Sequence, residues 1–350
     1  MFTEEKIIED LKDWKSLIKP YATPENGLAY KEIYKTILPF VGLFILALFT
    51  YEYSFALTLF ISFVAGLFLT RVFIIQHDCG HQSFFPNRKD NDRWGFICSL
   101  LTCIPYKYWA RSHNHHHAHQ GQLDTRTIGD VTLLTVREYQ ELSNFEKLKY
   151  RIYRSIPVMF VLGPIYYIFI HNRFPFIDFK GWEKERKMLV KTNFYLLIFY
   201  LGIGLLLSIP DFDVWYAFKK LALIYVPILF TFAFTAIWFF YMQHQHDPNY
   251  KAWKEDWQFV LAAIRGSSFY KLPAIFNFFT GNIGYHHIHH LAPKVPFYKL
   301  KKCSDENPVF QKHVTTIGLF SSIKFAFYTL WDEENYRMIR FSQLQRIRVS

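Results

Sequence analysis

Long apolar runs alternate with basic connecting segments along the whole chain. A helix that crosses a bilayer needs roughly 20 mostly apolar residues. Four runs are strong candidates for such helices, and they cover about 37–51, 54–75, 193–209 and 220–242. The first two are joined by the very short segment YEYS, which predicts a helical hairpin. This alternation is typical of a polytopic membrane protein and not of a soluble two-domain protein.

Two weaker apolar runs lie between the second and the third candidate. The run at 156–170 is short and is interrupted by Pro157, Gly163 and Pro164. Because proline and glycine break helices, we expect an interfacial or re-entrant segment there and not a span. The run at 94–104 is shorter still. The pattern therefore predicts four membrane-spanning helices.

Amphipathic segments are expected at both ends of the chain. Apolar residues near the N-terminus fall on one helical face, which predicts a helix lying on the membrane surface. These residues are Ile7, Ile8, Leu11, Trp14, Leu17 and Ile18. We assign 1–32 to this interfacial helix and its linker, 33–300 to the main domain and 301–350 to a C-terminal cytoplasmic tail. A second interfacial helix is predicted in the tail at 317–331.

The formal net charge is +11, from 40 Lys and Arg against 29 Asp and Glu. The basic residues flank the apolar runs and form no separate basic module. We therefore expect attraction to anionic lipid headgroups or to an acidic partner, and no binding of nucleic acid. The 4 cysteines have no CxxC spacing, which predicts reduced thiols.

Histidine is the residue type that carries the candidate chemistry. Most of the 15 histidines fall into four short clusters. An HxxxH pair ends the second predicted span, two HxxHH patterns follow later, and a QHQH segment comes directly after the last span. The clustered residues are His77 and His81; His113, His115, His116, His117 and His119; His244 and His246; and His286, His287, His289 and His290.

Two HxxHH patterns together with an HxxxH pair indicate metal binding, although a single such pair is usually incidental. One zinc ion takes three or four protein ligands, so a set of this size suits two metal ions. Soluble di-iron bundles use Glu and Glu-x-x-His motifs, and no such carboxylate set is present. Imidazole suits iron, zinc or copper, so these residues alone leave the metal open.

The clusters can form one site only if they lie on one side of the membrane. An even number of crossings must then separate His117 from His244, which agrees with four spans. The segments 82–155 and 171–191, like both termini, would be cytoplasmic, and they hold most of the Lys and Arg. We predict an all-α integral membrane protein of the cell (inner) membrane. Its four transmembrane helices carry a cytoplasmic helical cap with a histidine-ligated di-metal site.

Four segments outside and around the clusters carry a family resemblance. They are TRVFIIQHDCGHQSFF, LDTRTIGDVTLLTVREY, GSSFYKLP and TGNIGYHHIHHLAPKVPFYKL. With the boxes HxxxH, HxxHH and HxxHH, they resemble the membrane fatty acid desaturase family over about 38–300, notably bacterial acyl-lipid desaturases of the delta-5 or delta-12 type. The resemblance implies two iron ions, molecular oxygen as co-substrate, external electrons and a cis double bond introduced into a glycerolipid-bound acyl chain.

The family's metal ligands carry over residue by residue. They are His77, His81, His113, His116, His117, His244, His286, His289 and His290. His244 matches the family's ligand after the last span better than His246 does. His115, His119, His246 and His287 are then spare, and His171 and His313 stand alone. Sequence proximity makes five residues candidates for binding the outer ring nitrogens, namely Asp78, Asp124, Asp130, Asp247 and Asn282.

The chain has no haem-binding HPGG motif, so its electrons must come from a separate carrier. The resemblance implies ferredoxin or flavodoxin, and cytochrome b5 less so. A di-iron lipid hydroxylase has the same boxes and is the nearest alternative, distinguished by oxygen retained in the product. A bis-histidine haem carrier would place its histidines within spans, and a metal transporter would need ionisable residues near mid-membrane. Double-bond position and chain-length preference stay open.

Overall fold

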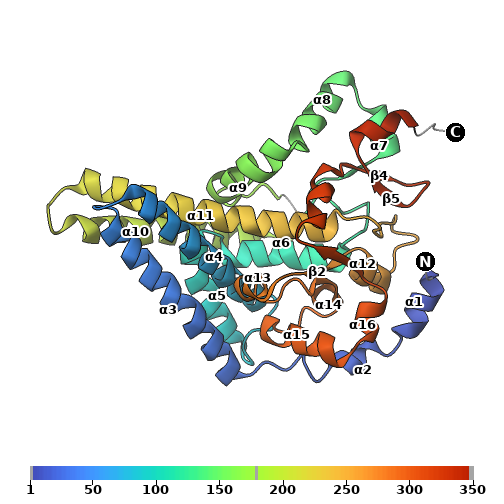
Figure 1. Cartoon of the computed structure of the whole chain (residues 1–350), viewed down its shortest axis with the longest axis horizontal. Coiled ribbons are helices and arrows are strands. Elements are labelled where there is room, and N and C mark those ends of the chain that lie inside the picture. The colour runs from blue at the N-terminus through green and yellow to red at the C-terminus, as the bar shows by residue number, and fades with distance from the viewer. Residues whose placement is uncertain (1–2, 178–179, 347–350) are drawn as a thin grey trace.

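The computed structural model describes residues 3–177 and 180–346 and is built around four long helices (Figure 1). They are α3 Asn26–Thr50, α4 Phe55–Gly80, α10 Glu183–Ser208 and α11 Val214–His244. Within the described ranges, these are the four single helices long and apolar enough to cross a membrane, which agrees in number with the four predicted transmembrane helices. The α3–α4 and α10–α11 turns lie at one end of the bundle, and both chain termini lie at the other (Figure 1).

Helix α4 is the central helix of this bundle. In its most apolar stretch 61% of residues are buried by protein, against 22% in α3 and in α10. Gly66 lets α11 approach closely, because a Cβ atom at this position would lie 2.5 Å from the Cβ atom of Thr231. The contact fixes α4 against α11, the two helices whose C-terminal ends carry His77 and His244.

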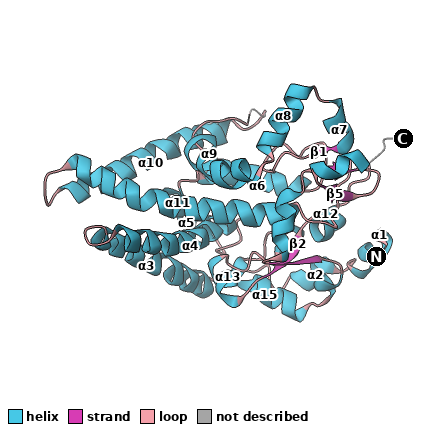
Figure 2. Ribbon diagram, turned by 45° about the horizontal axis from the view of Figure 1, so that its top comes forward, coloured by secondary structure: helices cyan, strands magenta, loops and turns pink. Residues whose placement is uncertain are grey.

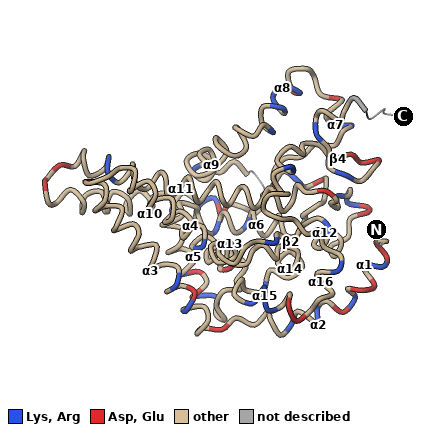
Figure 3. Tube along the Cα trace, viewed as in Figure 1, with Lys and Arg blue, Asp and Glu red and all other residues tan. Residues whose placement is uncertain are grey.

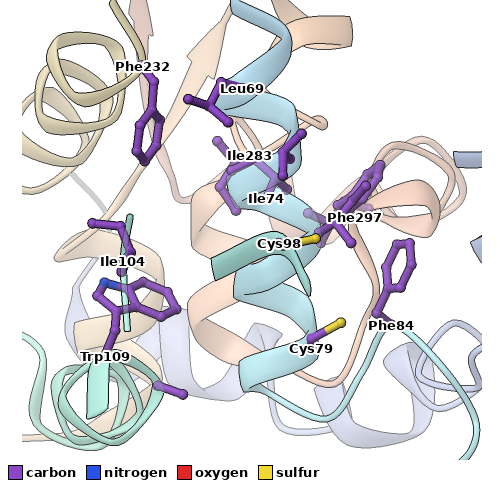
Figure 4. Packing of buried hydrophobic residues seen from close by; sticks show 14 of the residues in the cluster. Leu69, Ile74, Cys79, Phe84, Cys98, Ile104, Trp109, Phe232, Ile283 and Phe297 are labelled. Carbon is purple, nitrogen blue, oxygen red and sulfur yellow. The ribbon is translucent and has the colours of Figure 1, made fainter. Parts of the chain in front are cut away.

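A buried ion pair ties α3 to the same end of α4. The Arg71 guanidinium on α4 binds the Glu32 carboxylate and donates to the Thr36 hydroxyl on α3 at 3.0 Å. It also donates to the Phe278 carbonyl of α13, Ala274–Phe279, a short distance before the third histidine box. Apolar side chains such as Ile74, Ile283 and Phe297 pack around this junction (Figure 4).

Helices α5, Arg88–Thr102, and α6, Tyr106–His119, form a hairpin that packs against α4 (Figure 2). The last carbonyl groups of α5 accept hydrogen bonds from the neighbouring helices. The Tyr200 hydroxyl donates to the Leu100 carbonyl at 3.0 Å, and the Tyr225 hydroxyl donates to the Leu101 carbonyl at 2.7 Å. These bonds satisfy carbonyl groups that a helix end would otherwise leave without partners.

The segment expected to be interfacial or re-entrant lies in a bent helix pair. Helix α8, Asn144–Tyr153, is followed by a second helical stretch that runs from Val158 to His171, and the two meet at 56°. The second stretch consists of η1 Val158–Leu162, α9 Gly163–Tyr166 and η2 Tyr167–His171. By length and composition the pair fits either a broken span or a re-entrant loop, so the placement of 156–170 stays a prediction.

The rest of the chain forms a cap around the C-terminal ends of α4 and α11. Its helices are α1 Glu4–Asp10, α2 Trp14–Ile18, α7 Val136–Glu141, α12 Phe259–Arg265, α14 His286–Leu291, α15 Phe297–Glu306, α16 Val309–Lys312, η3 Ser321–Phe327 and η4 Phe341–Arg346. Two small sheets join them (Figure 2). One has the order β1 Leu134–Thr135, β4 Leu330–Asp332, β5 Arg337–Ile339, and the other pairs β2 Ser268–Lys271 with β3 Thr315–Gly318.

The prediction of a single N-terminal helix was wrong, while its position at the membrane surface stays a prediction. The segment forms two short helices, α1 and α2, and Ile7 and Leu11 are only 2% and 1% exposed. The Trp14 ring lies 6.2 Å from the Phe259 ring of α12. Protein therefore covers the apolar face that was expected to contact lipid.

The helix predicted at 317–331 is also absent. The segment contains part of β3, the short 3₁₀ helix η3 and the start of β4. Its ends pair with strands that lie far away in the sequence, since β3 pairs with β2 and β4 pairs with β1 and β5. Phe320 and Ile323 nevertheless remain exposed.

Charge is distributed unevenly along the bundle axis (Figure 3). The α10–α11 turn carries Asp211 and Asp213, and Glu52 of the α3–α4 turn pairs with Lys220 at 2.5 Å. Most Lys and Arg lie toward the opposite end, where the cap and both termini lie (Figure 3). Because basic residues favour the cytoplasmic side of a membrane, a cytoplasmic cap stays the prediction.

Candidate metal centre

The first histidine box ends helix α4. His77 and His81 are one turn apart, and both side chains are buried, because the cap encloses this end of the helix. Their ring centroids lie 4.6 Å apart. The central position of α4 therefore brings one pair of imidazoles into the middle of the molecule.

The second box lies on α6, on the side that faces α4. His113, His116 and His117 are all buried. The Trp109 indole, one turn earlier, stacks on His113 with ring centroids 4.6 Å apart and an interplanar angle of 17°. This aromatic contact restricts the orientation of the imidazole.

The third box forms the short helix α14. His286, His289 and His290 are at most 3% exposed. The preceding loop packs tightly on β2, because a Cβ atom at Gly284 would lie 2.5 Å from the Tyr270 carbonyl oxygen. The Tyr270 amide donates to the Gly284 carbonyl at 2.8 Å, so this strand sets where α14 begins.

Five of the sequence-predicted ligands form one group. Their ligand atoms all lie within 4.8 Å of one another, and the residues are His77, His81, His113, His117 and His289. The His117 Nε2 atom lies 3.0 Å from His113 Nε2 and 3.1 Å from His289 Nε2. We call these residues the five-histidine group.

The other four predicted ligands form a second group beside the first. His116, His244 and His290 have ligand atoms within 4.8 Å of one another. His286 joins them, because its Nε2 atom lies 2.9 Å from His244 Nε2 and 3.1 Å from His290 Nε2. The two groups touch where His117 and His290 stack with ring centroids 4.1 Å apart. We call the second set the four-histidine group.

The spacing of these nitrogens fits metal coordination. Two nitrogens that each lie about 2.1 Å from one ion, at right angles, are about 3 Å apart. The Nε2 separations within the groups range from 2.9 Å, between His286 and His244, to 3.3 Å, between His116 and His244. In addition, the buried Nε2 atom of His81 has no hydrogen-bond partner among the described residues. Each group therefore fits one metal ion.

Burial also keeps the imidazoles in the form that binds metal. Because desolvation disfavours the charged ring, it lowers the pKa of His116 to about 4. Burial likewise holds the pKa of His117, His289 and His290 well below the ordinary value. A neutral imidazole has a free lone pair for a metal ion.

The two histidines at the end of α4 each have a hydrogen-bond partner for the outer ring nitrogen, one on α4 itself and one on α6. His77 Nδ1 lies 2.9 Å from Asp78 Oδ1, and the other Asp78 oxygen accepts from the Phe297 amide at 2.6 Å. His81 Nδ1 lies 2.8 Å from Asn114 Oδ1. An acceptor at Nδ1 places the ring proton there and leaves Nε2 as the ligand atom.

The outer partners of the four-histidine group are looser. His244 Nδ1 lies 3.4 Å from both the Gly266 carbonyl oxygen and Gln120 Nε2. His116 Nδ1 lies 3.8 Å from Asp130 Oδ2. Asp78 and Asp130 were both predicted from their sequence positions as partners of outer ring nitrogens, and both lie beside one.

Three other predicted outer partners are hydrogen-bonded elsewhere, to backbone groups. Asp124 accepts from the Lys254 amide, Asp247 accepts from the Met338 amide, and Asn282 donates to the Phe297 carbonyl.

Sequence reasoning missed Asn114 and Gln120. Asn114 lies within the second box, and Gln120 follows the last residue of α6. Their closeness to the box was the available signal. Whether these side chains reach a histidine depends on the direction in which they point, and the packing of α6 against its neighbours determines that direction.

The comparison with known proteins settles the family. The sequence model described as "Fatty acid desaturase" matches residues 54–320, which is more than half of the chain. The chain belongs to the fatty acid desaturase family. The matched range extends beyond residue 300 into the predicted tail, where β3 pairs with β2.

Curated relatives agree with this assignment. A fatty acid desaturase of Bacillus subtilis (strain 168) is 40% identical over 349 residues, which cover 99% of this chain and 96% of that protein. An sn-1 oleoyl-lipid 12-desaturase of Picosynechococcus is 25% identical over 242 residues, 69% of this chain and 66% of that protein. An sn-1 acyl-lipid omega-3 desaturase (ferredoxin) of Synechocystis is 26% identical over 256 residues, 69% of this chain and 65% of that protein. The chain is therefore an oxidoreductase with desaturase relatives.

The remaining histidines of this desaturase lie outside both groups. His119 stacks on His115 with ring centroids 4.2 Å apart. His246 Nδ1 lies 2.8 Å from the Pro248 carbonyl oxygen, His287 Nε2 lies 3.5 Å from Gln311 Nε2, and His313 Nε2 lies 2.8 Å from Asp10 Oδ2. The His171 ring stacks on Tyr167. The geometry thus separates the nine predicted ligands from the spare histidines.

Proposed function

We propose that this desaturase uses two iron ions and molecular oxygen to introduce a cis double bond into a membrane lipid's acyl chain. The ligands in this proposal are His77, His81, His113, His116, His117, His244, His286, His289 and His290. The observation that carries the proposal is the division of these residues into groups of five and four, with neighbouring Nε2 atoms 2.9–3.3 Å apart.

The overall reaction removes two hydrogens from adjacent methylene groups. One oxygen molecule, two electrons and two protons are consumed, and two water molecules leave with the unsaturated chain. Bound iron would supply the activation of oxygen that an unreactive C–H bond requires. The protein's own part is to keep the imidazoles neutral, to orient them through Asp78 and Asn114, and to exclude bulk water from the centre.

Apolar rings beside the histidines provide a surface for the reacting methylene pair. The Phe240 ring lies 5.1 Å from the His116 ring and 4.9 Å from the His244 ring. Trp109 covers the other group, with its ring 5.8 Å from His77. An acyl chain held against such rings would keep one carbon pair at a fixed distance from the centre.

A glycerolipid-bound chain is the substrate we favour. The Picosynechococcus and Synechocystis relatives are named as oleoyl-lipid and acyl-lipid desaturases. The net charge of +11 would attract anionic headgroups to the cap. In this proposal the protein lies in the cell membrane with its cap and both termini in the cytoplasm.

Electrons would come from a soluble acidic carrier such as ferredoxin or flavodoxin. The Synechocystis relative carries the word ferredoxin in its name. A positively charged cap favours association with an acidic protein at low ionic strength.

Lipid analysis after expression in a host without polyunsaturated lipids tests the proposal. We expect new double bonds, mapped by mass spectrometry, in wild type and in His119→Ala, whose ring lies outside both groups. His289→Ala should abolish them, because it removes a ligand of the five-histidine group. Unchanged lipids in the wild type with a supplied electron donor would contradict the proposal. Oxygen retained in the product would identify the alternative, a lipid hydroxylase.

A further inference from the structure

One side of helix α6 remains open although its opposite side carries the second box. Residues at helical spacing, Lys107, Arg111, Asn114 and Ala118, lie along this open side. Arg111, Asn114 and Ala118 are exposed, and Lys107 is half-buried. The described part of the chain therefore leaves a strip of α6 accessible directly behind the centre.

Asn114 links this strip to the five-histidine group. Its Oδ1 atom lies 2.8 Å from His81 Nδ1, and its Nδ2 atom donates to the Gly80 carbonyl at 3.3 Å. The other side chains hydrogen-bonded to an outer ring nitrogen, Asp78 and Gln120, are 1% and 3% exposed. Among the described residues, Asn114 is thus the exposed side chain that is hydrogen-bonded to a candidate ligand.

Positive charge surrounds Asn114. Lys294 is exposed, and its Nζ atom donates to the His81 carbonyl at 2.7 Å. The Arg111 guanidinium lies over the Trp182 ring, 5.8 Å from its centroid. Lys107 binds Asp92, whose other oxygen lies 3.8 Å from the Arg88 guanidinium. Among the described residues, these contacts bring Arg88, Lys107, Arg111 and Lys294 near Asn114, and the nearby carboxylates of Asp92 and Glu183 are paired with cations.

We propose that this strip of α6 is the docking site of the acidic one-electron carrier and that Asn114 marks the point of electron entry. The inference rests on the proposed function, because it assumes an external carrier. Charge complementarity selects the occupant, since the cations along this strip outnumber its carboxylates, and a positive surface attracts an acidic protein. The small Ala118 side chain leaves room for close approach beside Asn114. An electron entering here would have one hydrogen bond to cross before it reaches His81.

Carrier binding to the protein in lipid nanodiscs tests the site without requiring turnover. The probe is purified ferredoxin, and the readout is its Kd at low and at high salt. We expect Arg111→Glu to raise the low-salt Kd about tenfold or more, and Arg111→Glu with Lys294→Gln to raise it further. The difference from wild type should shrink at high salt, because salt screens exposed charges.

Lys19→Glu is the matched control. It makes the same change of charge at an exposed residue that directly follows α2 and does not lie on α6. Its Kd should stay within about twofold of wild type. A Kd unchanged by Arg111→Glu, or raised equally by Lys19→Glu, would overturn the docking site. Neither result bears on desaturation itself, which the lipid analysis measures separately in the wild type.

Discussion

An imidazole that binds metal through one nitrogen depends on what its other nitrogen contacts. His81 shows this dependence clearly, because its Nδ1 atom lies 2.8 Å from Asn114 Oδ1 while its Nε2 atom has no hydrogen-bond partner within the described ranges. Loss of such an outer partner commonly costs 10- to 100-fold in metal affinity. Asn114 is therefore a positioning residue for the centre as well as an exposed one.

Asn114→Ala should lower iron retention during dialysis against a chelator by about tenfold or more, because His81 loses its acceptor. Asn114→Asp should retain iron better than Asn114→Ala, since a carboxylate can also accept from Nδ1. Asp124→Ala is the control, because Asp124 accepts from the Lys254 amide and not from a histidine. Equal iron retention in Asn114→Ala and Asp124→Ala would show that Asn114 does not orient His81.

The residues of the candidate centre could largely be predicted from sequence, but their grouping could not. The nine histidines were selected by box spacing and family resemblance. Their division into five and four depends on which way each ring turns, and this is set by packing between α4, α6, α11 and α14. His116 and His117 are adjacent in sequence, yet they lie in different groups.

At the scale of elements, the close contact between α4 and α11 determines how His77 and His244 are placed. Gly66→Ala would put a Cβ atom 2.5 Å from Thr231 Cβ and 2.8 Å from the Ile228 carbonyl oxygen. Overpacking of this kind costs about 1–3 kcal/mol. We expect a lower Tm and a partial loss of bound iron.

Gly42→Ala makes the same substitution in α3, where a Cβ atom would meet nothing within 4 Å. It should leave the Tm unchanged or raise it slightly, because alanine favours a helix by about 0.5–1 kcal/mol over glycine. Thermal unfolding of both variants in detergent provides the comparison. Similar Tm values for Gly66→Ala and Gly42→Ala would contradict the tight α4–α11 contact.

The helices formed by long apolar runs could be predicted from sequence, because the length and composition of a run are enough to indicate such a helix. The two terminal segments were not, since their structure depends on distant partners. Residues 317–331 form strand pairs with β1 and β2, which lie far away in the sequence. The apolar face of 7–18 packs against protein, including Phe259 of α12, and does not require a lipid surface.

At the scale of the whole molecule, four long helices bring the ends of α4 and α11 to the same side. The orientation of that side in the membrane can be tested with single cysteines. Tyr53→Cys and Phe212→Cys lie in the two turns, at positions 87% and 88% exposed. Both should react with an impermeant maleimide added to intact cells.

Lys19→Cys, in the cap, should react only in inverted vesicles. The natural cysteines form a suitable background, because Cys79, Cys98 and Cys303 are buried and Cys103 is half-buried. Labelling of Lys19→Cys from outside intact cells would reverse the orientation that the basic residues predict.

The metal content of the purified protein tests the central claim most directly. Two groups of buried imidazoles that each fit one ion predict about two iron ions per chain in the wild type. Plasma mass spectrometry of His289→Ala should show loss of iron from the five-histidine group, while His119→Ala should match the wild type. One ion per chain, zinc in place of iron, or wild-type iron content in His289→Ala would contradict the account.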